Sequence, residues 1–165
     1  MSGTPRLALP FLSPGQAQKE LFHNEALQIL DAVAAAAVEQ PPLGSPPSSP
    51  SPGACYLVAA GAAGEWAGRD QSLAAFTTGG WRFVAPVEGM IAYVRSAGLW
   101  AVFRSGAWEL GAVRGSALIV DGQQVVGSRA AAIAGPTAGT TIDVQARAAI
   151  DQVLAAMRQH GLIEP

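Results

Sequence analysis

Carboxylates are the residues of this chain that could most readily perform chemistry. Glu65, Asp70, Glu88, Glu109 and Asp121 lie along the middle of the sequence. A pair of carboxylates about 5 to 9 Å apart can hydrolyse a glycosidic bond, but the sequence does not show that any two of these meet. The motifs of serine hydrolases, nucleotide-binding loops and paired-histidine metal sites do not occur in it. We therefore expect no enzyme, and a capsule-degrading glycosidase stays as an alternative.

Metal and thiol chemistry has little support. The chain has 1 Cys and 2 His, so Cys55, His23 and His160 are too few for a four-ligand zinc site. A single cysteine at the start of a predicted strand is typical of a small buried apolar side chain. His23, Asn24 and Glu25 are consecutive on a predicted helix, where successive side chains diverge by about 100°. We expect no metal or cofactor, and interpret these three residues as a polar cluster or partner contact.

All 4 tryptophans lie two positions after a glycine. The triplets end at Trp66, Trp81, Trp100 and Trp108, and they predict a degenerate repeat in which a turn precedes an aromatic residue that anchors the next strand. An indole with a solvated face can instead stack on a sugar ring. Trp66, in the loop-like stretch 61–70, is the candidate for glycan binding. A carbohydrate-binding module is thus the alternative from another functional class.

Composition restricts the partners. The 165 residues carry 10 Lys and Arg against 12 Asp and Glu, a net charge of −2 without charge runs, so nucleic-acid binding has no support. No apolar run reaches the roughly 18 to 20 residues that cross a bilayer, and no signal peptide is recognisable. We expect assembly in the cytoplasm without membrane insertion. Because 50% of the residues are hydrophobic and 13% are charged, we also expect burial against other subunits in a homo-oligomer.

Residues 1–40 predict an amphipathic anchoring helix. Ser13, Pro14 and Gln16 have the order of an N-terminal cap, and apolar residues then recur at helical spacing from Phe22 to Ala37. We expect this segment to anchor the protein to a larger particle, and its removal to leave a soluble oligomer. The candidate anchoring residues are Gln16, Lys19, Phe22, His23 and Asn24.

Residues 41–53 are rich in proline and serine, which favours an extended linker that holds the helix away from the next domain. From 54 to 127, short β-branched or aromatic runs alternate with turn signals and predict a small antiparallel meander or barrel. The segments 78–80 and 96–98 supply the glycines of tight hairpins. The predicted strands are Cys55–Ala60, Leu73–Thr77, Trp81–Ala85, Met90–Arg95, Leu99–Arg104, Ala107–Leu110 and Ala117–Asp121.

Residues 128–165 predict a connector followed by an oligomerisation helix from Asp143 to His160. Asp143 can cap this helix, and Gly161 fits the left-handed position after it. An a/d-like seam along the helix predicts packing against neighbouring subunits or the β region. The candidate oligomerisation residues are Ile150, Val153, Leu154 and Met157.

Several sequence blocks resemble one known family. Thr4–Leu12, Pro14–Glu20 and His23–Leu27 are similar to the opening signature of an uncharacterised family of alphaproteobacterial prophage tail-fibre-like proteins, which includes the head-spike proteins of gene transfer agents. The similarity continues through 53–56, 64–68, 79–83 and 86–89 and covers residues 4–110, and the segment from 125 to 163 is similar to the C-terminal part of phage fibre proteins. Many family members carry further fibre domains, whereas this chain ends at Pro165, so the resemblance favours a base or adaptor for a separate fibre.

These observations predict a mainly β protein with flanking helices: an N-terminal amphipathic helix, a Pro-rich linker, a small antiparallel β-meander or barrel, and a C-terminal helix. The expected function is a structural component of a phage-like particle, a spike or fibre base that anchors to capsid or tail and supports adsorption to host surface polysaccharide. The expected partners are copies of itself in a trimer or pentamer, capsid or tail proteins, and a separate fibre protein. The resemblance places it in a virion or gene-transfer-agent particle that is assembled in the bacterial cytoplasm and released.

Overall fold

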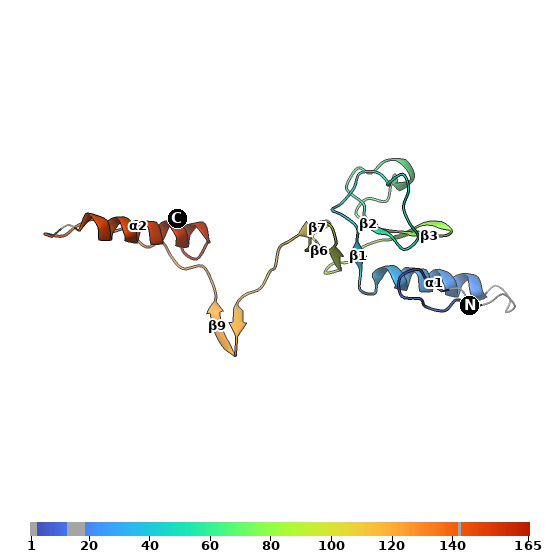
Figure 1. Ribbon diagram of the computed structural model, residues 1–165, viewed down its shortest axis with the longest axis horizontal. Coiled ribbons are helices and arrows are strands. Elements are labelled where there is room, and N and C mark those ends of the chain that lie inside the picture. Colours follow the sequence, from blue (N-terminus) through green and yellow to red (C-terminus); the bar gives the residue numbers. More distant parts are fainter. Residues whose placement is uncertain (1–2, 13–18, 142) are drawn as a thin grey trace. The chain divides into compact units, whose positions relative to one another are not determined.

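The computed structural model describes residues 3–12, 19–141 and 143–165, so the predicted cap at Ser13–Gln16 lies outside the described residues. The described chain is mainly β, with sheets of four, three and two strands and two helices (Figure 1). This confirms the predicted fold class, although the described strands close no barrel. The chain divides into two compact units, Met1–Ala112 (unit 1) and Val113–Pro165 (unit 2). The predicted boundaries differ, because residues 1–40 belong to unit 1 and the segment 54–127 crosses the division.

The first helix ends earlier than predicted. Helix α1 spans Lys19–Val33 and is followed by a two-residue strand, β1 (Ala37–Val38). Ala35 between them has a left-handed φ of 51°, which ends the helix, and β1 pairs in parallel with β5 (Ile91–Val94). Apolar spacing alone does not distinguish a last helical turn from a short buried strand. None of the described helices is long and apolar enough to span a membrane.

The seven predicted strands are all present. Strands β3, β6 and β7 have the predicted bounds and the ends of β2, β4, β5 and β8 shift by one to three residues, whereas β9 was not predicted. Strands β2, β3 and β4 form one antiparallel sheet, and β1, β5, β6 and β7 form the second in that order. Strands β8 and β9 form a separate hairpin in unit 2. Their bounds are β2 Cys55–Leu57, β3 Leu73–Thr77, β4 Gly80–Val84, β6 Leu99–Arg104, β7 Ala107–Leu110, β8 Leu118–Val120 and β9 Gln123–Val126.

The proline-rich segment 41–53 contains no helix or regular strand, as predicted, but it does not hold α1 away from the sheets. Leu43 bridges to Val58 in parallel, and its N–H donates to the carbonyl of Leu57 at 2.9 Å. The carbonyl of Gly44 accepts from Ala63 at 2.8 Å. The segment therefore lies against the end of β2 and the loop that follows it.

The main core of unit 1 draws on both larger sheets. Cys55, fully buried as predicted, belongs to this cluster together with α1 and β1 residues. Burial raises the pKa of its thiol. The buried members are Ala32, Ala36, Val38, Cys55, Leu57, Leu73, Ala75, Ala92, Val94, Ala101 and Trp108. A second cluster, built from Tyr56, Val58, Trp66 and Ala74, covers the opposite face of the three-stranded sheet.

Unit 1 contains the same three-stranded meander twice, as β2–β3–β4 and as β5–β6–β7. In the first, Gly53 N–H donates to the carbonyl of Phe76 at 2.8 Å; in the second, Gly89 N–H donates to the carbonyl of Phe103 at 2.9 Å. Phe76 pairs directly with Trp81, and Phe103 pairs directly with Trp108. The ring centroids of these pairs are 5.0 and 5.4 Å apart, with interplanar angles of 62° and 63°. The repeated unit is thus a meander, larger than the predicted turn-plus-strand.

The two repeats differ in what covers one of their faces. The registers of β2–β3 and β5–β6 place Leu57 opposite Leu73 and Tyr93 opposite Trp100. On the face that carries these pairs, the side chains of the first repeat are 0 to 5% exposed. In the second repeat, Ile91 and Trp100 on the same face are 52 and 56% exposed. The corresponding residues are Cys55 and Ile91, Leu57 and Tyr93, Leu73 and Trp100, and Ala75 and Val102.

Helix α2 of unit 2 spans Val144–Gln159 and has both predicted ends. The Asp143 side chain accepts a hydrogen bond of 2.9 Å from the backbone of the first turn. At the other end Gly161 has a φ of 69°, and Leu162 N–H donates to the carbonyl of Met157 at 2.9 Å. This is a Schellman closure, with Gly161 in the predicted left-handed position.

One side of α2 is covered by its own connector. Arg147 donates to the carbonyls of Pro136 and Ala138 at 3.1 and 3.0 Å, and Arg158 donates to the carbonyl of Ile133 at 2.6 Å. The arginines therefore fix residues 133–138 along the helix.

A buried carboxylate fixes the N-terminal segment on α1. Asp31 is 3% exposed, and its oxygens accept from the Thr4 hydroxyl at 2.7 Å, from Arg6 N–H at 3.0 Å and from Leu7 N–H at 2.6 Å. The Arg6 guanidinium caps the end of the helix by donating to the carbonyls of Asp31, Ala32 and Ala35 at 2.7 to 3.0 Å. Residues 4–7 are therefore part of the packed unit, and removing residues 1–40 should unfold unit 1, in contrast to the expectation from sequence.

We expect Asp31→Ala to lower the free energy of unfolding of unit 1 by about 3 kcal/mol, because three donors lose a charged acceptor inside the protein. Urea titration followed by tryptophan fluorescence measures this. Asp70 offers a comparison, since it also accepts two backbone N–H bonds but is exposed; Asp70→Ala should cost about 1 kcal/mol. Equal losses in the two variants would contradict a special role for Asp31.

Candidate functional site

Helix α1 turns its polar side toward the rest of unit 1. Asn24 accepts from Leu12 N–H at 3.0 Å and donates to the Leu12 carbonyl at 3.2 Å. Glu25 bonds Arg82, and Asp31 holds the N-terminal segment. The helix is therefore fixed through hydrogen bonds and an ion pair, with small residues such as Ala32 entering the core.

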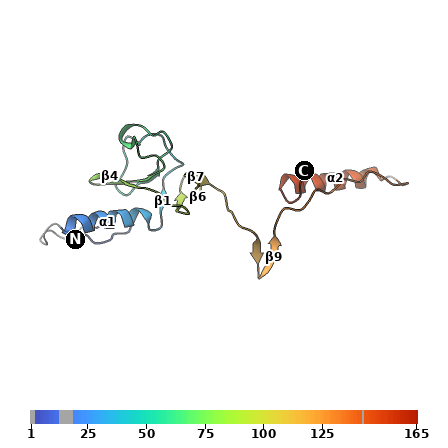
Figure 2. The ribbon, with the colours of Figure 1, turned by 180° about the vertical axis from the view of Figure 1, so that it is seen from behind.

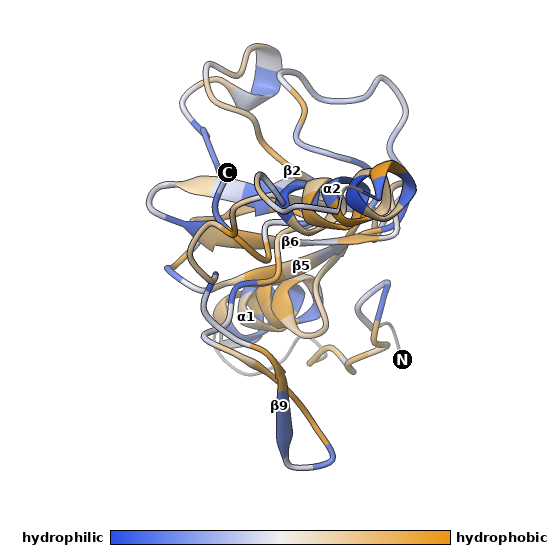
Figure 3. Cartoon of the chain, turned by 90° about the vertical axis from the view of Figure 1, so that its left-hand side faces the viewer, coloured by the Kyte–Doolittle hydropathy of each residue, from blue (hydrophilic) through white to orange (hydrophobic). Residues whose placement is uncertain are grey.

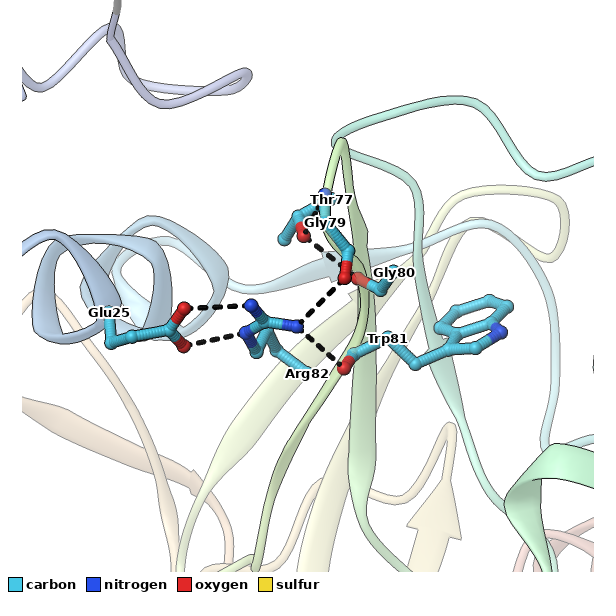
Figure 4. A network of polar contacts seen from close by, with 6 residues as sticks. All are labelled: Glu25, Thr77, Gly79, Gly80, Trp81 and Arg82. Carbon is cyan, nitrogen blue, oxygen red and sulfur yellow. Dashed lines mark hydrogen bonds and ion pairs between the residues drawn. The ribbon is translucent and has the colours of Figure 1, made fainter. Parts of the chain in front are cut away.

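The ion pair between Glu25 and Arg82 joins α1 to β4. Arg82 Nε and Nη2 donate to the two carboxylate oxygens at 2.6 and 2.7 Å, and Nη1 donates to the carbonyls of Gly79 and Trp81 at 3.3 and 3.2 Å (Figure 4). Thr77 Oγ1 holds the same turn by donating to the Gly80 carbonyl at 2.8 Å. Hydrogen bonding from Arg82 lowers the pKa of Glu25, and Glu25 raises the pKa of Arg82. The α1 helix and the β3–β4 hairpin lie side by side in both views (Figures 1 and 2).

The apolar side of α1 faces solvent. Leu21 is 61% exposed, Phe22 82%, Ile29 39% and Leu30 50%. We call these four residues the outer stripe. Their helical spacing was predicted, but an amphipathic helix normally buries such residues. The four residues therefore leave an apolar surface open in the single chain.

The predicted anchoring residues separate into different roles. Gln16 lies outside the described residues, and Lys19 is the first residue of α1. Phe22 and His23 are exposed. Asn24 is engaged with the backbone of Leu12 and serves the fold. Asn24 and Glu25 bond different partners, Leu12 and Arg82, as expected of consecutive helical residues that diverge.

A second apolar surface lies on the second repeat. Tyr93 and Trp100 are directly opposite each other on β5 and β6, with ring centroids 5.2 Å apart. They form one side of a groove of about 520 Å³ that we call the outer groove. Strands β5 and β6 are strongly hydrophobic (Figure 3). The lining residues are Val33, Ala35, Ala36, Ala37, Ile91, Tyr93 and Trp100.

Trp66, the predicted glycan-binding residue, is fully buried. It packs against Tyr56 and Trp81, with ring centroids 6.0 and 5.1 Å away, so a sugar ring cannot stack on it in this fold. The exposed indole belongs instead to Trp100, at 56%. The signal for this was present in the sequence, because apolar residues at successive positions of both 91–94 and 99–103 give a sheet two apolar faces.

The predicted seam of α2 is largely open. Ile150 is 48% exposed and Val153 is 59% exposed, while Met157 is half-buried. Leu154 differs from its predicted role as an oligomerisation residue. It is 6% exposed in the single chain and is not available to another subunit. Hydrophobic and hydrophilic residues alternate along α2 (Figure 3). We call Ala146, Ile150, Val153 and Met157 the α2 seam.

The candidate carboxylates of unit 1 have local partners. Glu65 accepts from Trp81 Nε1 at 3.2 Å, Asp70 accepts from Gly61 and Ala62, and Glu88 accepts from Ser105. Glu109 pairs with Arg104 at 3.4 Å. Asp121 lies in unit 2, at the β8–β9 turn. Each of the first four contacts fixes a turn, a loop or a strand edge, and sequence spacing did not predict them.

A family model described as a protein of unknown function, DUF2793, matches residues 23–109 of the chain. This match covers more than half of the 165 residues. The chain belongs to the DUF2793 family. The matched region runs from the first turns of α1 into β7 and includes both meanders, so the family unit is essentially unit 1. No curated protein matches the chain significantly.

We expect the Glu25–Arg82 pair to stabilise unit 1 at neutral pH and to lose this effect in acid. Because the folded pKa of Glu25 is lowered, its contribution is complete above the ordinary value of 4.5 and is lost as the pH falls through the lowered pKa. With the glutamate side chain 47% exposed, screening limits the contribution to about 0.5 to 1 kcal/mol. Glu25→Gln should therefore lower stability at pH 7 and have little effect well below the lowered pKa, as measured by urea unfolding at both pH values. A constant difference would contradict the assignment.

Proposed function

We propose that this protein is a structural component of a phage-like particle, a spike or fibre base that anchors to capsid or tail. In this role it supports adsorption to host surface polysaccharide by holding a separate fibre. The observation that carries the proposal is the outer stripe of α1. A helix locked by its polar side, with Phe22 82% exposed, is presented to another protein.

The outer stripe leaves large apolar side chains in contact with water. Burial of a large apolar side chain stabilises a fold by about 1.5 to 3 kcal/mol. Within a single chain, the residues of the outer stripe do not contribute most of this free energy. The helix cannot rotate to recover it, because Asp31 and Glu25 would lose their partners. A surface held open in this way supports docking on a larger shell.

Unit 2 supports self-association. Its buried hydrophobic residues are Leu154 and Ile163 among those described, and all residues of β8 and β9 are exposed. An isolated two-stranded hairpin is marginal in water. Copies of the chain can supply the missing contacts, which agrees with the expected trimer or pentamer.

The anchoring role predicts that the outer stripe is needed for incorporation into particles. Wild-type protein should co-purify with phage-like particles from the producing bacterium, and Phe22→Asp should reduce its amount at least 10-fold, because a charge in an apolar contact must be desolvated. Val87→Asp is the matched control, since Val87 is also a large exposed apolar residue, at 70%, but lies outside the stripe. Immunoblotting of gradient-purified particles measures both.

Circular dichroism of the purified variants shows whether each remains folded. Particles that lack the wild-type protein, or that incorporate the folded Phe22→Asp variant as well as Val87→Asp, would overturn the anchoring role.

A further inference from the structure

The internal repeat shows what normally covers the face that is open in the second meander. In the first repeat, Cys55 and Ala75 occupy this face and line a small cavity together with Gln28 and Ala32 of α1. The same helix is tied to Arg82, which lies opposite Ala75 in the register. The alanine side of α1 thus covers the part of this face at Cys55 and Ala75, while residues of the second meander complete the same core.

In the second repeat, no such helix covers the equivalent face among the described residues of unit 1. Ile91 and Trp100 remain 52 and 56% exposed beside the outer groove. The other α-helix of the described residues is α2, and its open seam also combines alanine with branched aliphatic residues, as at Ala146, Ile150 and Val153. The two surfaces match in chemistry.

We propose that the outer groove of one copy binds the α2 seam of a second copy. The inference rests on the proposed assembly role and names the contact that makes the assembly. Recognition of a helix by an apolar groove uses residues one and two helical turns apart, and Ala146, Ile150 and Val153 have the spacing i, i+4 and i+7. Both surfaces are uncharged, so no ion has to be desolvated when they meet.

A sugar fits the groove less well. Sites for small ligands combine an apolar wall with a few polar groups that fix orientation, and the side chains lining the groove offer only the Trp100 and Tyr93 tips. The seven residues that line the groove make a small contact beside the roughly 20 to 30 residues per side of a standard interface. In a closed ring each subunit makes this contact twice, once through its groove and once through its helix.

The contact has a consequence for symmetry. Groove and helix are different surfaces, so the interface is head-to-tail, and such an interface forms a closed ring when the rotation closes. A trimer or a pentamer satisfies this condition. A two-fold pairing of α2 with itself would instead leave the outer groove uncovered.

The test uses the full-length chain with Trp100→Glu in the groove or Val153→Asp in the seam. Both side chains are more than half exposed in the single chain, so the subunit fold should persist, and circular dichroism verifies it. Native mass spectrometry over a concentration series should show an oligomer for the wild type, and at least a roughly 30-fold rise in the dissociation concentration for each variant, as for a central interface residue. Val87→Glu and Gln152→Asp are the matched controls on exposed sites outside the two surfaces, and should assemble as the wild type does.

Mixing the two variants provides the decisive measurement. The Trp100→Glu chain keeps an intact seam and the Val153→Asp chain keeps an intact groove, so an equimolar mixture should form a heterodimer that neither forms alone. An oligomer that tolerates Trp100→Glu, or a mixture without the heterodimer, overturns this contact while the assembly role stands. A wild-type chain that stays a monomer at all concentrations overturns the assembly role itself.

Discussion

The buried carboxylate of Asp31 is the constraint on which the arrangement of unit 1 depends. A charge that is 3% exposed must be paired or fully hydrogen-bonded, and its donors come from Thr4, Arg6 and Leu7. This requirement brings residues 4–7 onto α1 and sets the rotation of the helix about its axis. Glu25 fixes the same rotation from the other direction through Arg82. The apolar side of α1 then has no position other than the outside.

Among the apolar surfaces of the described residues, the outer stripe, the outer groove and the α2 seam remain open in the single chain although the elements that carry them are well held. The outer stripe is open because α1 is held by polar contacts, the outer groove because its meander lacks the helix that covers the first one, and the α2 seam because the connector occupies the other side of that helix. Every one of these surfaces is carried by regular secondary structure. Their exposure is therefore built into the fold, and it accounts for the unusually low charge of the sequence, 13% of residues.

Prediction from the sequence succeeded where the signal is local. The glycines at 79–80 and 98 correctly predicted two hairpin turns, because few other residues adopt a positive φ. Asp143 and Gly161 correctly predicted the two ends of α2. The end of α1 was not found, since Ala37 and Val38 fit a helical stripe as well as a buried strand pairing with β5. The proline segment was correctly expected to be irregular, but its attachment to β2 depends on backbone hydrogen bonds that composition does not reveal.

The sequence by itself determined the mainly β character, the two helices and the excess of apolar residues that points to assembly. Only the tertiary structure decided which of these residues are exposed. Trp66 and Trp100 occur in the same Gly-x-Trp triplet, yet one is fully buried and the other is 56% exposed, because a long loop packs Trp66 into a second cluster while a tight turn precedes Trp100. Burial depends on contacts between residues distant in the chain, and a local pattern of residue types does not contain that information.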